Sequence, residues 1–351
     1  MALDKKSLIE LARANAKASL NPSTSYTVGS EKLSADAISS TFAKELNALG
    51  STPQLFRENA NTIYELIETG LTEVLPPRVL NAYGQFADVQ TIGFGDKAVF
   101  KLRVSDASKQ RAKQFVTKVA AAGRYEVFKL DGYEMTIPTG IIGGAARVEW
   151  EELLTGRFQM SDYWNLVLEG IDEAIYKEIA KALQATVAGL NPVNKTVQTA
   201  FDEKIMDKLL QTADVYGKSS IYCTFEFAAT MLPANSWQYS NEMKNEVWNN
   251  GAFTTYKGHT VIILPQSFED DTNAMKVIDP SYAYIIPNGS TKPVHVVFEG
   301  SAQVKQFENR DWSSEIHTYQ RVGVGTYMVN PGICVYQNTS LKKSNAWNPG
   351  E

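Results

Sequence analysis

Residues 161–189, SDYWNLVLEGIDEAIYKEIAKALQATVAG, have the pattern of one long amphipathic helix. Ser161 can cap its start, and Asp162 is favourably placed in the first turn. Gly189 and Pro192 end the pattern. Its apolar stripe steps by three or four residues through Trp164, Leu168, Ile171, Ile175, Ile179 and Ala182.

This helix is longer than a compact domain usually needs, because at 1.5 Å per residue it spans roughly 40 Å. The face opposite the stripe carries Glu169, Asp172, Glu173, Lys177, Glu178 and Lys181. We therefore expect that face to meet water or a charged partner.

Upstream, residues 86–148 change to an alternating pattern. Lys97–Val104 and Tyr125–Leu130 alternate polar and apolar residues around a polar tip, which predicts a long two-stranded hairpin. From Lys97 to Lys129 the chain has nine basic residues and two acidic ones. Because an isolated hairpin is marginal in water, we expect this one to lie across another surface. The alternative is a solvated loop.

The first part of the chain predicts three helices, at Leu3–Ser19, Ser34–Leu49 and from Pro53 to Gly70. Each has a narrow apolar stripe and little surface of its own to bury. We expect an arm that packs on something else.

Downstream, residues 199–290 have the pattern of an α/β segment. The expected elements are helices at Phe201–Thr212 and Asn241–Asn249, and strands at Ser220–Thr230, after the turn at Lys257-Gly258, and at Tyr282–Pro287. Further strands are expected at Val294–Phe298, Ala302–Phe307, Glu315–Val324 and Ile333–Tyr336.

Composition excludes several classes of protein. The 351 residues carry a net charge of −5, which argues against a protein that functions mainly by binding nucleic acid phosphates. Cys223 and Cys334 lie far apart in apolar runs and are expected to be buried thiols in a reducing compartment. The start has no secretory pattern, and no apolar stretch approaches about 18 residues. We expect a cytoplasmic protein.

The sequence shows no metal-binding, phosphate-binding or catalytic motif. His259, His295 and His317 are isolated, so structural roles are expected for each and no metal site is predicted. Gly93–Asp96 and Ile142–Ala145 lack the lysine of a phosphate loop, and the first is predicted to be a turn before the hairpin. We predict no catalytic residue, no cofactor and no enzymatic activity.

Aromatic residues crowd the connection Trp237, Tyr239, Trp248, Phe253 and Tyr256 within otherwise polar sequence. Core packing, a ligand platform and a subunit interface all remain open, and an interface is at least as well supported as core packing.

In this order, the elements resemble the major capsid protein of tailed bacteriophages, the Hong Kong phage fold that encapsulin shells share. The most family-like stretches are Cys223–Pro233 leading to Tyr256–Val261, and the ending Tyr319–Val324 followed by Asn330–Val335. The resemblance implies an α+β fold with an N-terminal arm, an extended β-hairpin loop, a peripheral domain with a long spine helix, and an axial α/β domain. The implied divisions are 1–75 for the arm, 76–150 for the loop and its flanks, 151–198 and 294–327 for the peripheral domain, and 199–293 and 328–351 for the axial domain, final strand and tail.

The resemblance also implies contacts between subunits. The basic hairpin would lie on an adjacent copy, facing acids that include Glu149, Glu151 and the spine-helix acids. The aromatic connection would lie toward the five- and six-fold axes, and the loop Phe307–Trp312 near three-fold axes. The contact residues so implied are Val99, Phe100, Lys101, Leu102, Arg103, Lys109, Arg111, Lys113, Val127, Phe128, Lys129, Glu169, Asp172, Glu173, Trp237, Tyr239, Trp248, Phe307, Asn309, Arg310, Asp311 and Trp312.

The function implied is that of a major capsid protein that forms hexamers and pentamers in an icosahedral or prolate head around double-stranded DNA. Its partners would be copies of itself, a separate scaffolding protein, a portal and decoration proteins, with no membrane, and assembly would take place in the host cytoplasm. The alternatives are an encapsulin-type compartment, and a soluble α/β ligand-binding protein or enzyme.

Overall fold

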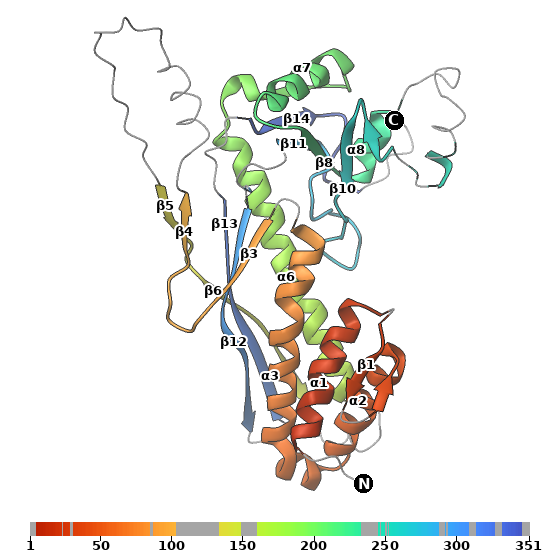
Figure 1. Cartoon of the computed structure of the whole chain (residues 1–351), viewed down its shortest axis with the longest axis vertical. Coiled ribbons are helices and arrows are strands. Elements are labelled where there is room, and N and C mark those ends of the chain that lie inside the picture. Colours follow the sequence, from red (N-terminus) through yellow and green to blue (C-terminus); the bar gives the residue numbers. More distant parts are fainter. Residues whose placement is uncertain are drawn as a thin grey trace, which may run out of the picture. The chain divides into compact units, whose positions relative to one another are not determined.

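A computed structural model gives the fold of the chain (Figure 1). It describes residues 5–22, 24–28, 31–84, 87–102, 133–148, 160–232, 245, 247–249, 251, 253–287, 292, 294–308, 314–326 and 332–345. The chain divides into two compact units. The first comprises Met1–Val99, Thr136–Ile179 and Val294–Gly325, and the second comprises Phe100–Met135, Ala180–Pro293 and Thr326–Glu351. The division into domains that the resemblance implies stays a prediction.

Three helices open the first unit, namely α1 (Lys5–Leu20), α2 (Ala35–Leu49) and α3 (Pro53–Tyr83). The predicted cap is confirmed, because the Ser34 hydroxyl accepts a hydrogen bond from the N–H of Ala37. A short hairpin, β1 (Tyr26–Val28) with β2 (Glu31–Leu33), joins the first two helices, where the sequence predicted only a break.

The predicted end of the third helix at Gly70 is wrong, since α3 continues to Tyr83. Gly70 instead lies against the Trp164 ring, where a Cβ atom would come within 2.3 Å of the ring carbon Cη2. The glycine therefore permits a close approach between helices rather than ending one.

The three helices also have a core, contrary to the expectation of an arm without one. The stripes of all three are buried, with Ile38, Ile63 and Leu71 fully inaccessible to solvent. Phe42 meets Trp164 edge-on with ring centroids 5.9 Å apart. These helices bury their apolar faces within their own chain, in the first unit.

The long helix predicted at 161–189 is α6 (Met160–Ala188), with Asp162 in its first turn. Its predicted apolar stripe is buried from Trp164 to Ile179. The cap, however, comes from elsewhere in the chain. The Asn47 side chain accepts a hydrogen bond from the N–H of Ser161 at 3.1 Å and donates one to its hydroxyl at 3.2 Å.

A four-stranded sheet completes the first unit, in the order β3 (Ala87–Ile92), β12 (Val294–Glu308), β13 (Ser314–Thr326) and β6 (Gly140–Val148). β3 runs parallel to the first half of β12, and β6 runs antiparallel to β13. Figure 1 shows α3 lying against this sheet, in agreement with the contacts between α3 and β12.

Side chains of α3 continue the edge of β12 where β3 ends. Thr72 accepts from the N–H of Ala302 at 3.1 Å, and Glu68 accepts from the N–H of Val304 at 2.8 Å. The sequence predicted two strands here, but Gly300, with a φ of 65°, bends a single strand without ending it.

The strand predicted at 97–104 begins two residues later in the structure, where the described part of it is β4 (Val99–Leu102). Its described partner is β5 (Tyr133–Thr136). The expected partner Tyr125–Leu130 lies outside the described residues.

The second unit contains a six-stranded sheet. Its order is β7 (Lys195–Gln198), β14 (Cys334–Asn338), β11 (Tyr282–Pro287), β8 (Ser219–Cys223), β10 (His259–Ile263) and β9 (Thr255–Tyr256). The final strand joins this sheet between β7 and β11, as the resemblance implied. The predicted turn at Lys257-Gly258 is confirmed, with positive φ at both residues between β9 and β10.

One strand of this unit was predicted too long. β8 ends at Cys223, and Thr224 then caps the short helix α8 (Phe225–Thr230) by accepting from the N–H of Phe227. The described part of the unit also contains α7 (Glu203–Asp214), capped by Asp202, a single 3₁₀ turn at Pro192–Asn194, and the end of α6. Of the helix predicted at Asn241–Asn249, the described residues 245 and 247–249 are helical.

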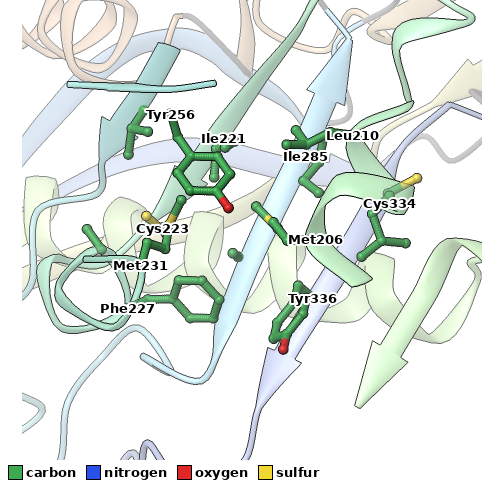
Figure 2. Packing of buried hydrophobic residues seen from close by; sticks show 14 of the residues in the cluster. Met206, Leu210, Ile221, Cys223, Phe227, Met231, Tyr256, Ile285, Cys334 and Tyr336 are labelled. Atoms are coloured by element: carbon green, nitrogen blue, oxygen red, sulfur yellow. The ribbon is translucent and has the colours of Figure 1, made fainter. Parts of the chain in front are cut away.

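Figure 2 shows the core of this unit, with Phe227 and Tyr336 beside Met206. Phe227 meets Tyr336 edge-on with ring centroids 5.8 Å apart. Both cysteines are buried free thiols in this cluster, as their apolar surroundings in the sequence predicted.

Candidate assembly surfaces

A groove lies between α6 and the edge strand β6 in the first unit. Its volume is about 190 Å³, and its lining is mostly apolar or small: Ile142, Gly143, Gly144, Ala145, Ala146, Tyr163, Leu166, Val167, Gly170, Ile171 and Ala174. Leu166 projects from α6 with 67% of its surface exposed. The exposed leucine and the apolar lining together form one apolar surface that is open to a contact with another chain.

The glycines of the groove differ in what they permit. A Cβ at Gly143 would lie 2.4 Å from the Thr318 carbonyl oxygen, so this glycine allows β6 to pack on β13. Cβ atoms at Gly144 and Gly170 would meet nothing within 4 Å. These two positions leave open space on opposite walls of the groove, through which another chain can approach the backbone closely.

The strand β6 forms one edge of its sheet. It pairs with β13 over nine residues and, within the part of the chain that the structure describes, has no strand on its other side. Such an edge presents free backbone donors and acceptors and invites pairing with another chain.

The predicted acidic residues of α6 have different surroundings. Glu169 is exposed, whereas Asp172 lies 3.1 Å from the Arg78 guanidinium and Glu173 lies 2.8 Å from Lys177. Burial raises the pKa of Asp172, and Arg78 opposes that shift. Glu169 and Glu173 are thus the more accessible of the three acids.

Of the predicted loop contacts, the structure describes only the beginning. Val99 is exposed on β4, whereas Phe100 is only 5% exposed within its own chain. For Lys101 and Leu102 the backbone of β4 is described and the side chains are not. The remaining loop positions lie outside the described residues: Arg103, Lys109, Arg111, Lys113, Val127, Phe128 and Lys129.

The aromatic connection does not act as one cluster in its described part. Phe253 and Tyr256 are buried, while Trp248 is 89% exposed. Trp237 and Tyr239 lie outside the described residues. Trp248 is the described member that is available for a contact.

The loop expected near three-fold axes is described only at its start. Phe307 is exposed at the end of β12 and packs edge-on against His317, with ring centroids 4.8 Å apart. Asn309, Arg310, Asp311 and Trp312 lie outside the described residues.

The three histidines have carboxylate neighbours close in the fold. His259 lies 3.5 Å from Asp214, His295 lies 3.7 Å from Asp88, and His317 lies 3.2 Å from Glu315. Among the described residues, no group of histidine, cysteine and acidic side chains is arranged to hold a metal ion. Nor does any described helix have the length and hydropathy needed to cross a membrane.

Sequence reasoning missed the groove. The run Gly143–Ala146 is visible in the sequence, but it has meaning only once Gly170 and Leu166 are known to lie opposite it. The signal available in advance was an edge strand of small residues beside a glycine in a helix.

Comparisons with known proteins agree with the fold. A family model described as "YonB: SPbeta prophage-derived putative capsid protein YonB" matches residues 14–331. A search of curated protein sequences finds no match.

Among solved structures, one from Microbacterium phage Oxtober96 has a TM-score of 0.50 and 11% identity, covering 73% of this chain and 90% of that chain. The capsid structure of the cyanophage P-SCSP1u has a TM-score of 0.49 and 10% identity, covering 73% of this chain and 86% of that chain. A virus-like particle from Pyrococcus furiosus has a TM-score of 0.40 and 13% identity, covering 76% and 99%.

The first of these likenesses supports the fold, and the family match covers most of the chain. The α+β capsid fold of the Hong Kong phage type, which the resemblance implied, is confirmed. The chain belongs to the YonB family of SPbeta prophage-derived capsid proteins, and it is a structural shell protein rather than an enzyme.

Proposed function

We propose that copies of this chain assemble into hexamers and pentamers that form the icosahedral or prolate head of a tailed double-stranded DNA phage. The observation that carries this proposal is the groove between α6 and β6. It combines an exposed leucine, open glycine positions and a strand edge that no described strand covers, all in one place on the first unit.

A neighbouring chain that covers the groove would stabilise both the exposed leucine and the edge strand. Burial of Leu166 removes apolar surface from water, and pairing along β6 satisfies backbone groups that otherwise remain with solvent. Small side chains on both walls let a neighbouring chain come close enough for both.

The occupant that we propose is the extended loop of an adjacent copy. Its excess of basic residues between 97 and 129 complements the accessible acids Glu169 and Glu173 of α6. Exposed pairs of this kind contribute only about 0–1 kcal/mol each, so their role is register and specificity. Apolar burial then supplies most of the affinity.

Further contacts are proposed at the exposed Trp248, toward the five- and six-fold axes, and at the loop that begins at Phe307, near three-fold axes. A scaffolding protein, a portal, decoration proteins and the packaged DNA complete the proposed set of partners, with assembly in the host cytoplasm.

The test is electron microscopy of the purified protein, expressed alone and with its neighbouring genes. Closed shells containing hexamers and pentamers, with DNA inside when the packaging genes are present, support the proposal. Shells that contain an enzyme instead indicate an encapsulin-type compartment. A stable monomer that binds a small molecule contradicts the proposal.

The loop assignment has its own test in the substitutions Val99→Asp and Phe128→Asp. Val99 is exposed on β4, whereas Phe100 is buried in its own chain and would confuse assembly with folding. Loss of shells with an unchanged circular dichroism spectrum supports the assignment. Intact particles from both variants would overturn it.

A further inference from the structure

Two short segments that flank the predicted extended loop bind the same carboxylate. Glu299 lies on β12 and is only 5% exposed. The N–H of Gly95, before β4, donates to its Oε1 at 2.9 Å. The hydroxyl of Thr139, after β5, donates to its Oε2. One side chain of the sheet thereby holds both roots of the loop, which we define as residues 93–96 and 137–140.

A tight turn in the first root directs the N–H of Gly95 toward Glu299. The N–H of Asp96 donates to the Gly93 carbonyl at 3.2 Å, and Gly95 has a φ of 82° at the third position of this turn. That conformation is typical of a type II turn and favours glycine. Above the turn, the Arg321 guanidinium lies 4.8 Å from the centre of the Phe94 ring. The root is therefore held through both a backbone and a side-chain contact.

The backbone of β12 bends next to Glu299 and is held there by hydrogen bonds. Gly300, with a φ of 65°, forms the bend of β12, and a Cβ there would come within 3.2 Å of the Phe94 ring. The buried amide of Gln320 donates to the carbonyl oxygens of Glu299 at 3.2 Å and of Gly300 at 3.4 Å. These bonds fix the backbone from which the carboxylate projects.

An ionised carboxylate suits this position because both of its partners in the roots are donors. The hydrogen bond from Thr139, followed by that from Gly95, holds the pKa of Glu299 below its usual range. Arg321, whose Nη1 lies 3.5 Å from Oε1, acts in the same direction.

We propose that Glu299 is a positioning residue for the two roots, which it locks to the bend of β12, so that the chain enters and leaves the predicted loop at fixed points on the sheet. The inference rests on contacts within the first unit and does not depend on the proposed assembly.

The test is hydrogen–deuterium exchange of the full chain carrying Glu299→Ala. We expect amides of both roots to exchange about tenfold faster, while amides in the middle of β12 and β13 keep their wild-type rates. Thr139→Val, which removes one donor with little change of shape, should accelerate mainly the second root. The matched control Glu315→Gln changes a more exposed carboxylate of β13 and should leave both roots unchanged.

A second measurement reports the position of the first root. Spin labels at Lys97→Cys and Lys305→Cys occupy exposed positions directly after the first root and on β12, and both native thiols are buried. Glu299→Ala should broaden the distance distribution between them. If Glu299→Ala does not fold, Thr139→Val and Glu299→Gln serve in its place. Wild-type exchange at both roots, or equal acceleration throughout β12 and β13, would overturn the proposal.

Discussion

Leu166 provides the sharpest test of the groove. About two thirds of its surface remains exposed in the single chain, so truncation should change the stability of the subunit very little. Full burial of a leucine side chain contributes about 1.5–3 kcal/mol, so covering the exposed two thirds contributes about 1–2 kcal/mol per subunit. Leu166→Ala should therefore raise the protein concentration needed for assembly about 5- to 30-fold.

The assay is light scattering across a dilution series, with the amount of shell confirmed by sedimentation. Val215→Ala is a matched control, because Val215 is 69% exposed on the second unit and outside the groove. Thermal unfolding of unassembled Leu166→Ala should match that of wild type. An unchanged assembly threshold for Leu166→Ala, with a normally folded subunit, would refute the role of the groove.

Four further outcomes are expected. Gly170→Leu should raise subunit stability by about 0.5–1 kcal/mol, because glycine is a poor helix former, yet block assembly by filling the groove; normal shells would contradict this. Asn47→Ala should lower the free energy of unfolding by about 0.5–2 kcal/mol through loss of the cap on α6, measured in urea. Phe227→Ala should cost about 3–5 kcal/mol in the same assay, because the ring is fully buried. Burial raises the pKa of Cys223 and of Cys334 to about 12. The thiol of an unfolded cysteine has a pKa of about 8.5. The contribution of the two buried thiols to the free energy of unfolding is therefore complete below that pH and declines above it. Replacing both by alanine should flatten the decline measured in urea between about pH 8 and 10.

Much of the fold could be predicted from local sequence patterns. The stripe of α6, the Ser34 cap and the turn at Lys257-Gly258 depend on neighbouring residues in sequence, and all three are confirmed. These features follow from backbone geometry and helical periodicity, which a single sequence contains.

Errors arose where tertiary contacts decide the outcome. Gly70 resembles a helix end in sequence, but its role is to admit the Trp164 ring from another helix. Gly300 resembles a turn, but it bends one strand over Phe94. At Thr224 the apolar run continues while the backbone changes from strand to helix, because the hydroxyl caps α8.

The candidate site was predictable only in part. The spine-helix acids were identified as a charged face, but the pairing of Asp172 with Arg78 depends on α3 continuing past Gly70. The groove joins residues of a strand to residues of the next helix, and the contacts of Glu299 with Gly95 and Thr139 join residues 204 and 160 positions apart. No periodicity in the sequence reports such a juxtaposition.

The central claim is that this chain forms a shell by self-assembly, and single-particle electron microscopy of the protein expressed with its neighbouring genes tests it most directly. The account predicts closed particles built from hexamers and pentamers, with density from an adjacent copy in the groove between α6 and β6. Only compact monomers, both alone and with the neighbouring gene products, would contradict it.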